Sequence, residues 1–170
     1  ESGKEKPVAG EVVFKELINI PSREGISEFI KNYKVRNEHI DVDAIVRSDY
    51  FAVNFQERES MYFGEVREGE MDGKGVLITK NSVFEGEWSR SNKVEGVEIT
   101  AKGTYKGKFA NNERSKVGEF HWNNGEYYSG EWSKGKKHGT GIIRLLNGNL
   151  YDDLFGGGVT SAQAVWSVGE

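Results

Sequence analysis

The sequence predicts a mainly β repeat domain with a small helical or α/β cap at its N-terminal end. An aromatic residue followed two positions later by glycine recurs at intervals of 22, 21 and 23 residues, and a last copy after another 23 has lost its glycine; the leading rings are Tyr62, Phe84, Tyr105, Tyr128 and Tyr151. A near-constant period of this length is typical of a stacked array in which each unit covers the apolar side of its neighbour. The chain also holds 22 glycines against 2 prolines, which favours many tight turns over a proline-rich linker.

The residues before the first repeat predict a cap. Ile26, Phe29, Ile30 and Tyr33 are spaced as i, i+3, i+4 and i+7, which indicates a short amphipathic helix that begins after Ser22. Residues 51–55 alternate between apolar and other side chains, so we expect a strand that covers the edge of the first repeat. Residues 11–20 are apolar enough for a buried strand or a short helix, and their periodicity does not decide between the two.

Each repeat is expected to form a hairpin. The ring and its glycine lie on the first strand, a glycine-containing loop turns the chain, and an alternating second strand such as residues 118–122 follows. Asn124-Gly125 favours a tight turn to the next hairpin, because both residue types tolerate positive φ. The predicted organisation is therefore a cap over residues 1–60, a repeat array over 61–155, and a glycine linker with a C-terminal tail over 156–170.

Two copies of the repeat carry a longer glycine pattern that resembles the MORN repeat. One runs from Tyr62 through Gly64, Gly69, Gly73 and Gly75, and the other from Tyr128 through Gly130, Gly135, Gly139 and Gly141. The middle copies depart from it, with Ser91 and Asn92 in one and Asn112 in the other at places where glycine is expected. The chain thus resembles a MORN-repeat protein with four repeats over about residues 62–148 and a partial fifth to about 155.

The resemblance implies a single elongated, twisted antiparallel sheet of consecutive hairpins and a scaffold or targeting role. MORN arrays occur in cytoskeletal, organelle-division, membrane-junction and signalling proteins, and as modules attached to enzymes. We therefore expect a cytoplasmic protein, associated with the cytoskeleton or with an organelle or plasma membrane. The chain begins at Glu1 and not at methionine, so a longer parent protein is expected.

Composition and motifs argue against catalysis. The chain has no cysteine, which excludes disulfides, thiolate metal sites and a cysteine nucleophile. His39, His121 and His138 show no paired ligand spacing, and no nucleophile–base constellation or Walker motif is present. The net charge of −4 disfavours nucleic-acid binding. Strand alternation would place several of the acidic residues, among which are Glu85 and Glu87, on the solvated face, so a carboxylate pair for glycoside hydrolysis is not expected. We expect no enzyme activity, cofactor, metal or small-molecule substrate.

The aromatic residues form the leading candidate site. Positions four apart on a strand point to the same face, so the leading rings share one face with the residues four positions later. These columns either form the core between repeats or, because a single sheet has no second layer, anchor a partner helix or extended peptide. The second alternative predicts a protein-binding groove lined by Tyr62, Phe84, Trp88, Tyr105, Phe109, Tyr128 and Trp132.

Other interactions remain open from the sequence. Lys134, Lys136 and Lys137 form a basic loop that would attract an anionic phospholipid such as a phosphoinositide, or would be an ordinary solvated loop. Open sheet edges at the ends of the array would allow a homodimer. A role as the targeting domain of a larger enzyme is a further alternative to a free-standing scaffold.

The tail beyond residue 158 lacks the repeat pattern. It follows three consecutive glycines, typical of a flexible linker, and carries one tryptophan in an apolar stretch that includes Val165 and Trp166. Two alternatives follow. The tail folds back to complete the sheet, or it docks in the aromatic groove as a peptide would.

Overall fold

The computed structural model describes residues 23–47, 51–56, 60–146, 150–155 and 164–166. They cluster in two compact units, with the division inside β5 (Asn92–Thr100). Unit 1 holds the described residues up to Ser91 together with Glu98–Ala101, and unit 2 holds Asn92–Val97 together with those from Lys102 onward. The predicted boundaries after residues 60 and 155 stay predictions, and the expected element at residues 11–20 lies outside the described residues.

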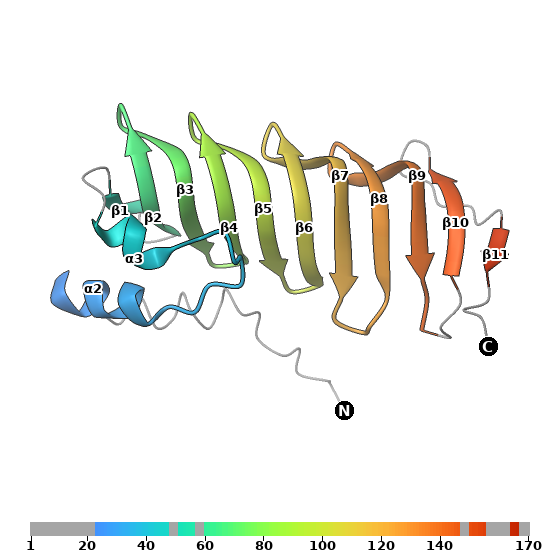
Figure 1. Cartoon of the computed structure of the whole chain (residues 1–170), viewed down its shortest axis with the longest axis horizontal. Coiled ribbons are helices and arrows are strands. Elements are labelled where there is room, and N and C mark those ends of the chain that lie inside the picture. The colour runs from blue at the N-terminus through green and yellow to red at the C-terminus, as the bar shows by residue number, and fades with distance from the viewer. Residues whose placement is uncertain (1–22, 48–50, 57–59, 147–149, 156–163, 167–170) are drawn as a thin grey trace. The chain divides into compact units, whose positions relative to one another are not determined.

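Unit 1 combines two short helices with consecutive antiparallel strands (Figure 1). Its elements are α2 (Arg23–Asn32), α3 (Val42–Arg47), β1 (Phe51–Gln56), β2 (Ser60–Arg67), β3 (Glu70–Thr79) and β4 (Ser82–Ser89). The predicted amphipathic helix and the predicted strand at 51–55 are confirmed by α2 and β1. As expected, β1 pairs antiparallel with β2 and so covers the edge of the first repeat. The Asp41 carboxylate accepts a hydrogen bond of 2.9 Å from the Ala44 amide, which caps the N-terminus of α3.

Unit 2 continues the succession of antiparallel strands. Its elements after residues 92–97 are β6 (Gly103–Ala110), β7 (Glu113–Trp122), β8 (Tyr127–Ser133), β9 (Lys136–Arg144), β10 (Leu150–Phe155) and β11 (Ala164–Trp166). Each strand from β6 to β10 pairs with the next one along the chain. In β11, Val165 pairs with Tyr151 and Trp166 with Leu150, so the tail folds back onto the sheet. The predicted mainly β fold, an open antiparallel sheet of consecutive hairpins, is confirmed.

Paired glycines give the hairpins a common register. Gly64 faces Gly75, and equivalent glycines face each other across β6–β7 and β8–β9. A bulge follows the glycine on the first strand of all three hairpins. The leading tyrosine lies over the facing pair, so that a Cβ on Gly75 would overlap the ring of Tyr62. The glycines are therefore required because a ring takes the space of a side chain.

Each leading tyrosine forms a hydrogen bond within its own hairpin, whereas the two tryptophans bond to the preceding hairpin. The hydroxyls of Tyr62, Tyr105 and Tyr128 donate to the backbone carbonyl three residues later, at 2.7, 2.8 and 2.7 Å. Burial raises the pKa of Tyr128 to about 12, with a further contribution from the nearby carboxylate of Glu131. The Nε1 of Trp88 donates to the carbonyl of Gly75 at 3.3 Å, and the Nε1 of Trp132 donates to that of Gly118 at 3.1 Å. The recurrent ring and glycine are thus parts of one packing unit.

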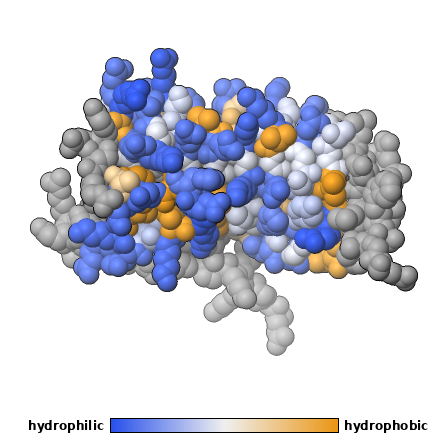
Figure 2. Space-filling model, viewed as in Figure 1, coloured by the Kyte–Doolittle hydropathy of each residue, from blue (hydrophilic) through white to orange (hydrophobic). Residues whose placement is uncertain are grey.

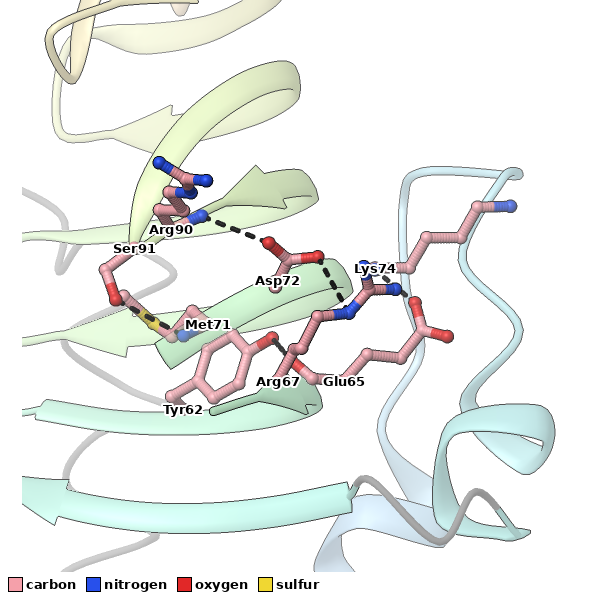
Figure 3. A network of polar contacts seen from close by, with 8 residues as sticks. All are labelled: Tyr62, Glu65, Arg67, Met71, Asp72, Lys74, Arg90 and Ser91. Atoms are coloured by element: carbon pink, nitrogen blue, oxygen red, sulfur yellow. Dashed lines mark hydrogen bonds and ion pairs between the residues drawn. The ribbon is translucent and has the colours of Figure 1, made fainter. Parts of the chain in front are cut away.

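Polar contacts link the hairpin tips of unit 1 (Figure 3). The Asp72 carboxylate lies 3.9 Å from the Nε of Arg67 and accepts a hydrogen bond of 3.3 Å from the Arg90 amide. The Ser91 amide donates to the carbonyl of Met71 at 2.8 Å, and the Met71 amide donates to Ser91 Oγ at 3.2 Å. Successive tips are therefore held together by side chain and backbone alike.

The two middle copies keep the turn geometry without the expected glycines. Ser91 and Asn112 adopt φ values of 62° and 61°, close to the 76° of Gly135. The Asn112 side chain accepts a hydrogen bond of 2.8 Å from the Lys93 amide and donates to the side chain of Asn92 at 3.1 Å. These bonds offset part of the cost of a left-handed conformation in a residue with a Cβ.

Candidate interaction surfaces

The predicted groove residues are buried. The side chains of Tyr62, Phe84, Trp88, Tyr105, Phe109, Tyr128 and Trp132 are 0–6% exposed. Within each unit they lie on one face of the strands, here called the ring face. In unit 1 the Trp88 ring contacts Tyr62 and Phe84 edge-on, with centroids 5.7 and 5.0 Å apart. In unit 2 the Tyr105 ring contacts Phe109 and Trp132 at 5.1 and 5.2 Å. The rings thus form the core between hairpins, and partner binding on this face stays a prediction.

Cationic side chains cover the rings of unit 2. The Arg114 guanidinium lies 5.3, 4.7 and 5.7 Å from the ring centroids of Tyr105, Phe120 and Trp132. The Lys137 ammonium lies 4.7 Å from the centroid of Trp122, and burial lowers its pKa. Such contacts combine apolar packing of the stem with cation–π attraction.

The three lysines of the predicted basic loop differ in their exposure to solvent. Lys134 and Lys136 are exposed, whereas Lys137 is partly buried against aromatic rings. A lipid headgroup would therefore meet the first two side chains more readily than the third. Binding of the loop to an anionic lipid stays a prediction that now rests on Lys134 and Lys136.

The equivalent position in another repeat indicates which residue can replace Arg114 without loss of stability. Arg114 pairs with Phe109 as Met71 pairs with Val66, so arginine and methionine occupy equivalent positions. We expect Arg114→Met to keep the free energy of unfolding within about 1 kcal/mol, because an apolar chain of similar length also covers the rings. Arg114→Ala should lower it by about 1–2 kcal/mol through lost packing and cation–π attraction. Urea denaturation measures both, and equal losses in the two variants would contradict this packing role.

The opposite face of unit 1 is covered by its own helical segment. This face, here called the helix face, carries side chains that are fully buried: Met61, Phe63, Val76, Ile78, Val83 and Glu85. Figure 1 shows the axis of α2 running across the strands rather than along them. Immediately after α2, the Tyr33 ring packs edge-on against Phe63 with centroids 5.5 Å apart. Ile30, Ile40 and Ile45 are buried in the same helical segment.

Glu85 holds that segment in place. Its Oε1 accepts a hydrogen bond of 2.7 Å from the Tyr33 hydroxyl, and its Oε2 accepts from the amides of Arg36 and Asn37 at 2.6 and 2.8 Å. The Asn37 side chain returns a bond of 2.9 Å to the Glu85 carbonyl. Burial raises the pKa of Tyr33, and the charge and hydrogen bond of Glu85 raise it further. A buried carboxylate is tolerated when charge-assisted bonds of this kind satisfy it.

Several acidic residues were expected on a solvated face, and Glu85 is an exception to that expectation. Strand alternation correctly places Glu85 and Glu87 on the face opposite the rings, but only Glu87 is exposed. The difference arises because residues 33–37 cover Glu85 and supply its donors. The sequence carries one sign of this burial: Val83, two residues before Glu85 on the same face, is apolar.

The equivalent face of unit 2, here called the open face, is polar and accessible. Backbone pairing places its side chains in two rows, Thr104–His121–Tyr127–Arg144 and Lys106–Glu119–Ser129–Ile142, beside which lies Val117. Val117 is 55% exposed and Ile142 is 42% exposed. Figure 2 shows small apolar patches set among hydrophilic atoms over β7 to β9. Where unit 1 has Phe63 and Glu85 after the leading ring, unit 2 has Lys106 and Ser129.

Aromatic and charged groups on the open face contact one another. The rings of His121 and Tyr127 are stacked, with centroids 5.4 Å apart at an interplanar angle of 20°. The Arg144 guanidinium lies 4.8 Å from the Tyr127 centroid, and His121 Nε2 lies 3.5 Å from a Glu119 carboxylate oxygen. This arrangement offers flat aromatic area, two apolar side chains and several cations to a macromolecule.

The part of the chain that the structure describes carries neither a metal-ligand cluster nor a membrane-spanning helix. Within it, no cluster of three or more metal-ligating His, Cys, Asp or Glu side chains occurs. Nor does any described helix combine the length and the apolar character needed to cross a membrane. Of the histidines, His39 and His121 each lie near one glutamate, at 4.0 and 3.5 Å, on the protein surface.

Comparison with known proteins identifies the repeat. Three segments match the family model of the MORN repeat: residues 62–82, 105–127 and 128–150. The predicted resemblance is therefore confirmed for these copies, while the copy that contains Ser91 and Asn92 lies outside the matched segments. A search of the curated proteins found no match.

Proposed function

Because the chain carries MORN repeats, which are non-catalytic and in general serve protein or membrane interactions, we propose that it is a protein-interaction module. Its binding surface is the open face of unit 2, and its partner is another protein that contributes a helix. The proposal replaces the ring face as the first contact, because the rings there are already buried.

One observation carries this proposal: the helix face of unit 1 binds a helical segment of its own chain. That segment contributes apolar side chains and hydrogen-bond donors, which meet Phe63 and Glu85. The open face lies on the same side of equivalent strands and keeps Val117 and Ile142 exposed. Exposed apolar side chains within a polar surface are a usual mark of a protein-binding site.

The proposal is tested by affinity capture from cells that express the full-length protein, with matched variants. Val117→Asp and Ile142→Asp should each reduce the amount of the principal co-purified protein at least tenfold, because a buried, unpaired carboxylate opposes association. The melting temperature should not change, since both side chains are exposed in the unbound chain. The double variant Lys134→Glu/Lys136→Glu is the control and should retain the protein.

The opposite pattern would contradict the proposal. A partner that is retained by both open-face variants but lost with the lysine variant would indicate the basic loop. If binding of anionic vesicles is lost with the same lysine variant, the membrane-targeting alternative is favoured instead.

A further inference from the structure

The charge at one repeat position differs between the two units. In unit 1 the residue after the leading ring of the second copy is Glu85, whose carboxylate collects the donors of the docked segment. In unit 2 the residue after the next leading ring is Lys106, which is exposed on the open face. An ammonium has donors only, so the corresponding group on a bound segment must be an acceptor. This inference rests on the proposed function of the open face.

A second cation lies at the other side of the same face. Lys106 is on β6 and Arg144 on β9, three strand spacings across the sheet and two residues along the strand direction, which together make about 16 Å. Arg144 lies over the Tyr127 ring, which limits its conformational freedom. Carboxylates two to three turns apart on a helix are separated by about 11–16 Å and so match this spacing.

Two described acids on this face, Glu119 and Glu131, are engaged by neighbouring groups of the sheet. Glu119 pairs across the strands with Lys106 and lies 3.5 Å from His121, so it is surrounded by cationic or protonatable groups. The Glu131 carboxylate accepts hydrogen bonds from the Thr140 amide and hydroxyl at 2.6 and 3.1 Å, and these bonds lower its pKa. It is therefore engaged with its own hairpin.

Apolar contacts complete the surface. Ile142 lies two residues before Arg144 on β9, and Val117 lies two residues before Glu119 on β7, so both are on the same face as the cations. We propose that the open face binds an acidic amphipathic helix of a protein partner. Its apolar side chains pack on Val117 and Ile142, and its carboxylates bind Lys106 and Arg144.

Three synthetic helical peptides of about 18 residues test this proposal. They share one leucine stripe and differ only in the flanking residues, which are glutamate, glutamine or lysine. Binding to the full chain is measured by fluorescence anisotropy at low and at high salt. We expect the glutamate peptide to bind about tenfold more tightly than the glutamine peptide and the lysine peptide to bind most weakly, with differences that shrink in high salt.

Charge reversal locates the site. The double variant Lys106→Glu/Arg144→Glu should invert the order of the three peptides, because like charges now oppose the glutamates. Lys134→Glu, a reversal at an exposed lysine in the β8–β9 turn, is the matched control and should leave the order unchanged. Melting temperatures of all variants confirm that they are folded.

Any of the following outcomes would overturn the inference that the open face binds an acidic helix. Equal binding of the three peptides would mean that the surface selects for apolar area alone, which leaves the proposed function intact. Preferred binding of the lysine peptide, or of none, would exclude an acidic helix. Loss of the glutamate peptide with Lys134→Glu would move the site to the basic loop, and binding of anionic vesicles through Lys106 and Arg144 without peptide binding would indicate a lipid ligand.

Discussion

Replacing Glu85 with alanine is expected to lower the free energy of unfolding by about 3–5 kcal/mol. The change leaves the Tyr33 hydroxyl and the amides of Arg36 and Asn37 without their acceptor, and each unmet buried donor costs about 1–3 kcal/mol. It also leaves a cavity in a fully buried position. Urea denaturation of the full chain measures the loss, and hydrogen exchange should show faster exchange at the amides of Arg36 and Asn37.

Glu87→Ala is the matched control for this change. Glu87 lies two residues further on β4, on the same face, but it is exposed. Its replacement should change the free energy of unfolding by no more than about 0.5 kcal/mol. Equal effects at Glu85 and Glu87, or unchanged exchange at Arg36 and Asn37, would show that the helical segment does not depend on the buried carboxylate.

Gly118→Ala is expected to destabilise unit 2 by about 3 kcal/mol. A Cβ at this position would overlap the Tyr105 ring, which donates its hydroxyl to the Lys108 carbonyl and packs against Trp132. Movement of the ring would break both interactions, and overpacking of this kind costs about 1–3 kcal/mol, with more when a hydrogen bond is also lost. Thermal denaturation followed by tryptophan fluorescence measures the effect.

Gly125→Ala is a control that measures the cost of backbone strain without any overlap with a ring. Gly125 has φ of 97°, but a Cβ there would meet no atom within 4 Å. Its replacement should cost only about 1 kcal/mol, the penalty for a positive φ. The Gly118→Ala effect should also fall in a Tyr105→Ala background, since the overlapping ring is gone. Strict additivity of those two changes would contradict the account of the glycine.

The hairpins could be predicted from the sequence because ring and glycine are coupled locally. Tyr62 needs both Gly64 and Gly75 beneath it, and that requirement recurs as a visible period. The loss of glycine at Ser91 and Asn112 weakened the pattern without changing the turns, since both residues adopt positive φ. Contacts between residues close in the sequence therefore determine the hairpins, and for this reason the sequence pattern was enough to predict them.

The segments that cover each face of the sheet could not be predicted from the sequence pattern. Alternation assigns Glu85 and Lys106 to a face, but the cover over Glu85 comes from residues 33–37, about fifty positions earlier, in a loop of which only Tyr33 belongs to a periodic pattern. The sequence left open whether the rings form the core between repeats or anchor a partner. In the structure the rings pack on one another, and Arg114 and Lys137 cover those of unit 2 with side chains that composition alone assigns to solvent.

Cysteine labelling tests most directly whether the helix face is covered while the open face is accessible. The chain contains no cysteine, so one substitution gives one reporter. Val76 and Ile142 each follow the second glycine of a facing pair, yet Val76 is fully buried and Ile142 is 42% exposed. We expect Ile142→Cys to react with a maleimide at a rate close to that of a free thiol and Val76→Cys to react at least a hundredfold more slowly, with the difference reduced by Glu85→Ala. Equal rates at the two positions, or protection at position 142 in the isolated chain, would contradict the account.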